Sequence, residues 1–122
     1  MTVTRLTVTG RIPSKKNSRN VFCRKGRPVT IPSKEYLSWH KKSCLELIGT
    51  KRIDGMCEIK IVFFWPDRRI TDLTNKAESI MDLLVDNHII TNDSWGYIPN
   101  LHLLSGGLDR GNPRAEISIT QI

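Results

Sequence analysis

Apolar and polar residues alternate along three segments of the chain, at residues 2–10, 57–65 and 114–122. A period of two predicts β-strands that bury one face. In the segment 57–65, Val62 and Phe64 add apolar side chains to the second face, which favours a central place in a sheet. A fourth strand is expected within residues 95–104, where Pro99 interrupts the pattern.

Residues 72–86 instead repeat apolar side chains at helical spacing. The apolar residues fall on an arc about 100° wide, and polar residues lie opposite. The apolar set is Leu73, Ala77, Ile80, Met81 and Leu84, and the polar set is Asn75, Glu78, Asp82 and Asp86. Asn87 is expected to end this helix.

An earlier helix is expected over residues 33–49, between Ser33 as N-cap and Gly49 as terminator. The side chains that share one side of it are Leu37, His40, Lys41, Cys44 and Ile48, with Leu45 widening that side. Residues 10–32 are rich in glycine and proline, so we expect a loop there, with a short extended piece at residues 21–23.

The expected order of elements is therefore β-α-β-α-β-β. With no repeat and no long linker, this order predicts one domain across residues 1–122. The fold class is α/β (α+β), with two helices packed on a small mixed β-sheet. No segment approaches the roughly 20 apolar residues of a membrane span, and the start lacks the apolar core of a signal peptide. We therefore expect a soluble, cytoplasmic protein with no membrane partner.

The chain is strongly basic, with 19 Lys and Arg against 12 Asp and Glu and a formal net charge of +7. Seven of these bases and no acid lie between Arg11 and Arg27. Such an excess attracts polyanions, above all nucleic acid, because binding releases counterions from the phosphate backbone. An anionic membrane fits less well, because the segment has no amphipathic helical pattern. A basic surface that only keeps the protein in solution is the simpler alternative.

The cysteines are Cys23, Cys44 and Cys57, an odd and widely spaced set that argues against a disulfide framework or a zinc ribbon. His40 and Cys44 lie four residues apart on an expected helix, a spacing that can place both on one metal ion. Because no second pair of ligands is visible, a core cysteine beside a half-buried histidine is the favoured interpretation.

Acidic residues concentrate in and around the second helix, although the chain is basic. Glu78, Asp82 and Asp86 form successive like-charged pairs, each of which costs roughly a few tenths of a kcal/mol unless a cation offsets it. Asp72 precedes the helix and Asp93 follows it, in loops that can build a site. Because Mg²⁺ prefers oxygen ligands, the pattern predicts a Mg²⁺ site, with Mn²⁺ as a substitute. A solvated polar helix face is the alternative.

The length of the helix limits which carboxylates can meet. Asp72 and Asp86 lie about 21 Å apart along the helix axis. The chain from Asp86 to Asp93 spans at most about 25 Å. Asp93 can therefore return toward Asp72 only on a nearly straight segment, which Ile89 and Ile90 can anchor in the core. Asp86 is expected to stay at the surface.

These residues resemble the RusA family of Holliday-junction resolvases along most of the chain. The resemblance includes the early strand followed by "IPSKKNS", then "PDRRITDLTNK", the "DLL" within the helix, the Asn-Asp pair at Asp93 and a terminal strand. It implies a magnesium-dependent endonuclease that acts as a homodimer and makes paired nicks in a four-way DNA junction, in recombination and repair. It also implies a nucleoid-associated, phage-type protein.

The resemblance carries over to individual positions. Asp72 matches the first aspartate of the family, Asp93 the last, and Asn75 the asparagine that follows the first. Thr74 stands where a second aspartate is usual, and Glu78 stands where a helix lysine is usual. Glu78 lies about 40° from Thr74 around the helix and can replace the missing carboxylate. Lys76 is the candidate for the missing cation, although it lies about 160° from Glu78.

The site is therefore expected to contain the following residues. The catalytic set is Asp72, Asp93, Glu78 and Lys76, and the metal ligands are Asp72, Asp93, Glu78 and Asp82. The DNA-binding set is Lys15, Lys16, Asn17, Arg68, Arg69 and Asn75. An arginine next to the carboxylates, such as Arg68 or Arg69, can hold the scissile phosphate. His88 and His102 are expected to be structural, and Trp95 is expected to pack rather than to wedge into a junction.

Two other functions stay open at this point. If Thr74 and Glu78 mark a decayed metal site, the protein binds junction DNA without cutting it. A protein-interaction or RNA-binding module is the third interpretation, and it predicts no preference for junctions over linear duplex or RNA.

Overall fold

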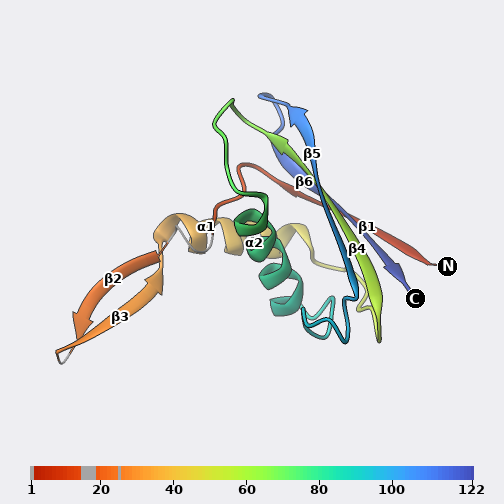
Figure 1. Cartoon of the computed structure of the whole chain (residues 1–122), viewed down its shortest axis with the longest axis horizontal. Helices are drawn as coiled ribbons and strands as arrows, with labels where there is room; N and C mark the ends of the chain where they lie inside the picture. The colour runs from red at the N-terminus through yellow and green to blue at the C-terminus, as the bar shows by residue number, and fades with distance from the viewer. Residues whose placement is uncertain (1, 15–18, 25) are drawn as a thin grey trace.

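The computed structural model describes residues 2–14, 19–24 and 26–122. Its main sheet has four strands in the order β1-β6-β4-β5. They are β1 (Val3–Thr9), β4 (Cys57–Trp65), β5 (Asn100–Leu108) and β6 (Arg114–Gln121). β6 pairs antiparallel with β1 and β4, whereas β5 lies parallel to β4. The predicted mixed sheet is confirmed, with β4 inside it and β5 at one edge (Figure 1).

A second, two-stranded sheet occupies part of the segment predicted as a loop. Strands β2 (Arg19–Arg24) and β3 (Arg27–Pro32) pair antiparallel. Gly26 lies in the turn between them with φ 75°, a left-handed conformation that suits glycine. The predicted extended piece is thus one strand of a hairpin, which projects from the N-terminal end of α1 away from the main sheet (Figure 1).

Helix α1 (Lys34–Glu46) begins where the sequence predicts, because the Ser33 hydroxyl accepts a hydrogen bond from the Tyr36 amide. Its buried face is not the predicted one. The side chains that it buries are Tyr36, Trp39 and Ser43. The predicted side is largely in solvent, with exposed fractions of 53%, 64% and 75% for Leu37, Leu45 and Ile48. The helix carries apolar residues on two sides, and the aromatic side packs into the core, whereas of the predicted side His40 and Cys44 are partly buried, in contact with α2 and Asn87.

Helix α2 (Leu73–Asp86) connects the parallel strands β4 and β5, which need such a crossover. Its predicted apolar face is buried, with Leu73 partly so. Asn87 ends the helix as predicted, and its side chain donates to the Leu83 carbonyl over 2.8 Å. His88 follows with φ 56°, the left-handed conformation common after a helix. No helix in the described part of the chain is long and apolar enough to cross a membrane.

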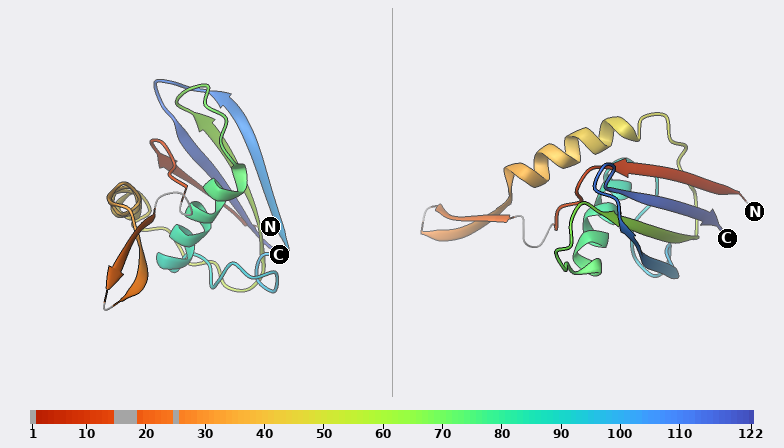
Figure 2. Two further views of the ribbon diagram at one scale, coloured as in Figure 1. Left: turned by 60° about the vertical axis from the view of Figure 1, so that its left-hand side comes forward. Right: turned by 90° about the horizontal axis from the view of Figure 1, so that it is seen from above.

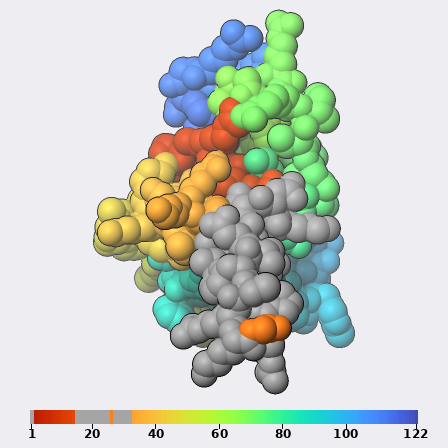
Figure 3. All heavy atoms as spheres, turned by 90° about the vertical axis from the view of Figure 1, so that its left-hand side faces the viewer, coloured from red at the N-terminus to blue at the C-terminus, as the bar shows by residue number. Residues whose placement is uncertain are grey.

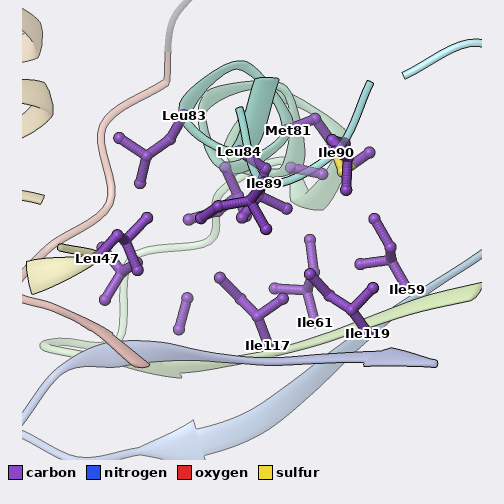
Figure 4. Packing of buried hydrophobic residues seen from close by; sticks show 14 of the residues in the cluster. Leu47, Ile59, Ile61, Met81, Leu83, Leu84, Ile89, Ile90, Ile117 and Ile119 are labelled. Carbon is purple, nitrogen blue, oxygen red and sulfur yellow. The ribbon is translucent and has the colours of Figure 1, made fainter. Parts of the chain in front are cut away.

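Both helices lie on the same side of the main sheet, so the domain has one helical layer and one sheet layer (Figure 2). Isoleucines of β4 and β6 point toward α2 and the segment after it (Figure 4). These core side chains are at most 1% exposed: Ile59, Ile61, Leu84, Ile89, Ile117 and Ile119. On the far face of the sheet, the Arg114 guanidinium lies 3.9 Å from the centre of the Phe64 ring.

Strand β5 continues through the Ser-Gly-Gly-Leu segment, although adjacent glycines are typical of a turn. The pairing of β4 with β5 shifts at Phe63/Phe64, and Gly106 is the residue left out of register. A Cβ atom at Gly106 would lie 2.7 Å from the Phe64 ring and 2.9 Å from Val62 Cγ1. Gly106 therefore leaves room for the Phe64 ring, and β5 passes over this ring without a turn.

The loop that joins β4 to α2 stands beside the turn between β5 and β6 at one end of the molecule. The Asp109 amide donates to the Trp65 carbonyl over 2.9 Å and joins the two segments. Figure 3 shows the loop in light green next to the turn in blue. The sheet thus delivers the Pro-Asp-Arg-Arg motif to an exposed end, just before α2 begins.

Candidate functional site

Asp72 is the N-cap of α2. Its backbone is extended, and Oδ1 of its carboxylate accepts hydrogen bonds from the Thr74 amide over 2.9 Å and the Thr74 hydroxyl over 2.6 Å. The Asn75 amide group lies 3.4 Å from the other oxygen, Oδ2. Asp72 therefore fills the capping role that its position allows, and both neighbours fix the direction of its carboxylate.

Glu78 and Asp93 face a common groove between α2 and β5. The groove has a volume of about 220 Å³ and is lined by Thr74, Ala77, Glu78, Met81, Asp93, Ile98, Leu101 and Leu103. Asp93 reaches it because the preceding residues Ile89 and Ile90 are buried, at 1% and 2% exposure, as the sequence predicts. Asp72 adjoins the Thr74 end of the groove through its bond to the Thr74 hydroxyl.

Asp82 does not join these carboxylates. The Tyr36 hydroxyl of α1 donates to its Oδ2 over 2.7 Å, so Asp82 belongs to the contact between the two helices. Asp86 lies on the same side, 49% exposed, with its carboxylate 2.9 Å from His40 Nε2. The physical reason is angular, because Asp82 lies about 40° around α2 from Glu78, away from the groove and toward α1. The four predicted metal ligands are therefore divided between two places.

Lys76 lies away from the groove, as its angle on the helix implies. It is 8% exposed, and its Nζ donates to the Ile12 carbonyl over 2.6 Å. Burial lowers the pKa of this ammonium from its ordinary value, nearby Arg11 lowers it further, and Glu35 and Asp67 act in the opposite direction. The structure does not bring Lys76 together with Glu78 and Asp93, so in this arrangement it positions the backbone rather than a substrate.

Arg68 and Arg69 line a second groove, of about 580 Å³, at the end of the molecule where the β4–α2 loop meets β5. Arg69 pairs with Asp67, with 3.3 Å between Nε and Oδ2, and Asp67 also pairs with Arg11. Both arginines are exposed. The two grooves follow one another along β5, since Leu101 and Leu103 line the first and Ser105 and Leu108 the second.

The remaining predicted residues are placed as follows. Lys15, Lys16 and Asn17 lie outside the described residues. His88 and His102 are exposed, and neither lines the carboxylate groove. Trp95 is 87% exposed, so the expectation that it packs is wrong. It follows Asp93 in a turn, and none of the described helices and strands covers its indole ring.

Two features of the site are not evident from the sequence. Thr74 stands where the resemblance implies an aspartate, yet its hydroxyl links the Asp72 carboxylate to the groove. The spacing of His40 and Cys44 predicts that they lie together, and the structure places Cys44 Sγ 3.5 Å from His40 Nδ1. The other ring nitrogen turns out to face α2, a contact between distant segments that spacing along one helix does not reveal.

Comparison of the sequence with family models and with characterised proteins identifies no relative. No family model matches the chain, and no characterised protein matches it significantly in sequence. The likeness to the RusA family therefore remains a prediction from the motifs around Asp72 and Asp93.

Proposed function

We propose that the protein is a magnesium-dependent, structure-selective endodeoxyribonuclease that cuts four-way DNA junctions. The observation that supports this most is the groove that Glu78, Asp93 and Thr74 line together, in a chain of net charge +7. Carboxylates repel DNA, so a protein built to bind DNA has reason to expose a pair of them in a groove only where a cation offsets their charge.

The residues of the groove fit Mg²⁺ in donor type. Glu78 and Asp93 offer hard carboxylate oxygens, Thr74 offers a hydroxyl, and Asp72 adds a third carboxylate at the Thr74 end. Mg²⁺ in phosphodiester chemistry typically takes one or two protein carboxylates and fills its other positions with water and substrate phosphate. When bound, the ion would neutralise charge on the phosphate and make a bound water a better nucleophile. Asn75 and Thr74 then hold Asp72 in one direction.

The arginines support a role in binding the DNA strand. Strand β5 places Leu101 by the carboxylates and Leu108 by Arg68 and Arg69, a distance of about 23 Å at the rise of a β-strand. A DNA strand lying along β5 would place one phosphate at the carboxylates. A phosphate several nucleotides away would then lie at the arginines. The basic segment that starts at Arg11 adds attraction that decreases with salt.

A homodimer is part of the proposal, because one chain has one carboxylate groove and resolving a junction takes two cuts. The edge strand β5 offers Leu104 to a second copy, a side chain that is 44% exposed and lines neither groove. Sedimentation equilibrium of the purified protein measures this directly, and a monomer at all concentrations that support cleavage would exclude it. In the cell, such a protein acts in the cytoplasm on the nucleoid.

One observation favours a second candidate function, a junction-binding protein without nuclease activity. No basic side chain lines the groove among the described residues, because Lys76 is directed to the Ile12 carbonyl. A groove whose charged side chains are all carboxylates binds a metal ion but has no protein cation to stabilise the leaving oxygen.

The experiment uses a synthetic four-way junction with labelled arms. Wild-type protein is expected to make paired nicks with Mg²⁺ or Mn²⁺ and none with EDTA. Asp93→Asn and Glu78→Gln should each reduce cleavage by at least about 100-fold, since even residues that only support a metal ligand cost 10–100-fold when changed. Asp54→Asn, a change at an exposed acid that does not line the groove, serves as the control.

Each outcome decides between the alternatives. A junction that shifts in a gel but stays intact with both metals supports the binding protein. Equal affinity for junction, linear duplex and RNA supports the general nucleic-acid module. Cleavage that survives Asp93→Asn undiminished would remove the groove from the mechanism.

A further inference from the structure

The contact between the two helices contains a group of metal-ligand side chains that the proposed function does not use. His40 comes from α1, and Asp82 and Asp86 come from successive turns of α2. One ligand atom of each lies within 4.8 Å of those of the other two. Within the ranges that the structure describes, this is the group of three such side chains that converges in this way, whereas Asp72, Glu78 and Asp93 do not.

We propose that His40, Asp82 and Asp86 bind a divalent transition-metal ion that links α1 to α2, at a site separate from the carboxylate groove. Asp82 and Asp86 are an i,i+4 pair of like charges on one helix, which repel each other unless a cation lies between them. His40 Nε2 already lies 2.9 Å from Asp86 Oδ2. Zinc–ligand bonds of about 2.0–2.2 Å set tetrahedral ligand atoms about 3.3–3.6 Å apart, so the 2.9 Å pair would open slightly and any wider pair, at most 4.8 Å, would close.

Neighbouring side chains orient two of the proposed ligands. Histidines that bind metal usually donate a hydrogen bond from the other ring nitrogen, which orients the ring. Here Nδ1 of His40 lies 3.5 Å from Cys44 Sγ, and the Asn87 amide group lies 3.3 Å from the same sulfur. The Tyr36 hydroxyl, 2.7 Å from Asp82 Oδ2, orients that carboxylate in the same manner. Cys44 therefore supports the ring and is not itself a ligand.

A plain ion pair between His40 and Asp86 is the competing explanation. It accounts for the 2.9 Å contact, and the Tyr36 hydroxyl occupies one oxygen of Asp82, but neither contact requires both carboxylates to converge on His40. A bound cation accounts for both carboxylates and for the orienting contacts of Tyr36 and Cys44. The two explanations differ in a measurable way, because only one of them makes stability depend on added metal.

The ligand set indicates the class of metal. Imidazole with two carboxylates suits borderline ions such as Zn²⁺, Co²⁺ or Ni²⁺, whereas Mg²⁺ and Ca²⁺ prefer oxygen donors throughout. Asp86 is 49% exposed, so an ion can enter from solvent, and a water can complete the coordination.

The position of the site indicates what the ion would do. α1 follows directly after the β2–β3 hairpin, and α2 carries one wall of the carboxylate groove. Figure 2 shows α1 beside α2 on the same side of the sheet. A metal between the helices would hold the base of the hairpin at a fixed distance from the groove, and it would stabilise the folded state in proportion to its binding.

The test is metal binding by the full chain after dialysis against a chelator. Calorimetric titration with Zn²⁺ should give one site per chain, and Co²⁺ should give a visible absorption band that Zn²⁺ displaces. His40→Asn and Asp86→Asn are expected to weaken Zn²⁺ binding by at least about 100-fold, and Tyr36→Phe by about 10-fold. Cys44→Ser should keep the site.

Asp93→Asn is the control that separates this site from the groove, and His102→Asn controls for an exposed histidine. Both should bind Zn²⁺ as wild type does, and Zn²⁺ should raise the melting temperature of these proteins but not of His40→Asn. Equal Zn²⁺ affinity in wild type and His40→Asn overturns the proposal. Loss of binding in Asp93→Asn assigns the ion to the groove and overturns it as well. None of these readouts depends on nuclease activity, so the two proposals fail independently.

Discussion

The ammonium group of Lys76 donates a hydrogen bond to the carbonyl oxygen of Ile12 over 2.6 Å. Three residues further along α2, the Ser79 hydroxyl donates to the next carbonyl, that of Pro13. One face of α2 thus anchors the backbone at the point where the basic segment begins. The sequence places its longest run of positive charge directly after this anchor.

Burial of Lys76 gives stability a dependence on pH. Its pKa in the folded state is below the ordinary value of 10.5, so between the two values the unfolded chain binds more protons. The free energy of unfolding should therefore increase as pH rises through the folded-state pKa toward 10.5. Lys76→Met removes this titration, so wild type should gain stability relative to the variant as pH rises. Urea unfolding of both proteins from neutral to alkaline pH measures the difference.

Lys41→Met, which removes an exposed lysine of α1, controls for the change in net charge. A difference between wild type and Lys76→Met that stays constant or decreases with pH would contradict the assignment.

Ser79→Ala should destabilise the protein by about 1–3 kcal/mol, because it removes the hydroxyl that satisfies the buried Pro13 carbonyl. Ser79 is 0% exposed, so water cannot readily replace the bond. Ser38→Ala, at an exposed position of α1, should change stability by less than about 0.5 kcal/mol. Chemical denaturation of the three proteins compares them, and similar midpoints for all three would show that the anchor is weak.

Two substitutions of Asp72 are expected to separate its role in capping the helix from its role in binding metal. Asn is as good an N-cap as Asp, so Asp72→Asn should keep the melting temperature while Mg²⁺-dependent cleavage falls. Asp72→Ala should lose about 0.5–2 kcal/mol of stability as well. Thermal melts and junction assays on the same preparations give the melting temperature and the cleavage rate of each variant. If Asp72→Asn cleaves as wild type does, the carboxylate serves the helix alone.

Gly106→Ala should cost about 1–3 kcal/mol, the usual range for forcing an atom into a packed site. The added Cβ would meet the Phe64 ring at 2.7 Å and Val62 at 2.9 Å. Gly111→Ala is the matched control, because a Cβ there meets nothing within 4 Å. Differential scanning calorimetry should show a lower melting temperature for the first variant only. A stable Gly106→Ala protein would mean that β5 moves freely away from β4.

The architecture could be predicted where one local signal decides it. The helix that follows Asp72 has a cap, a single apolar face and an Asn stop, and the structure agrees with each. The helix that follows Ser33 has the cap but two candidate faces. The packing of α1 against β1 and α2 buries Trp39 and leaves Leu45 exposed. Periodicity along one segment does not contain that information.

The site could be predicted in part for the same reason. The return of Asp93 to α2 follows from helix length and from two adjacent isoleucines, and the groove contains it. The position of Asp82 outside the groove depends on its contact with Tyr36, 46 residues away. No sequence pattern shows which acid a tyrosine hydroxyl will bind. In the sequence, Gly106 likewise resembles part of a turn. The structure shows instead that the absence of a side chain makes room for the Phe64 ring.

Helix α2 presents three different faces to three different tasks: the groove at Glu78, the backbone anchor at Lys76 and Ser79, and the contact with α1 at Asp82. One residue inserted within it would turn everything downstream by about 100°. Homologous chains should therefore vary freely in the length of the hairpin and the surface turns, yet keep the count from Asp72 to Asn87 unchanged, even where few of the side chains between them are the same.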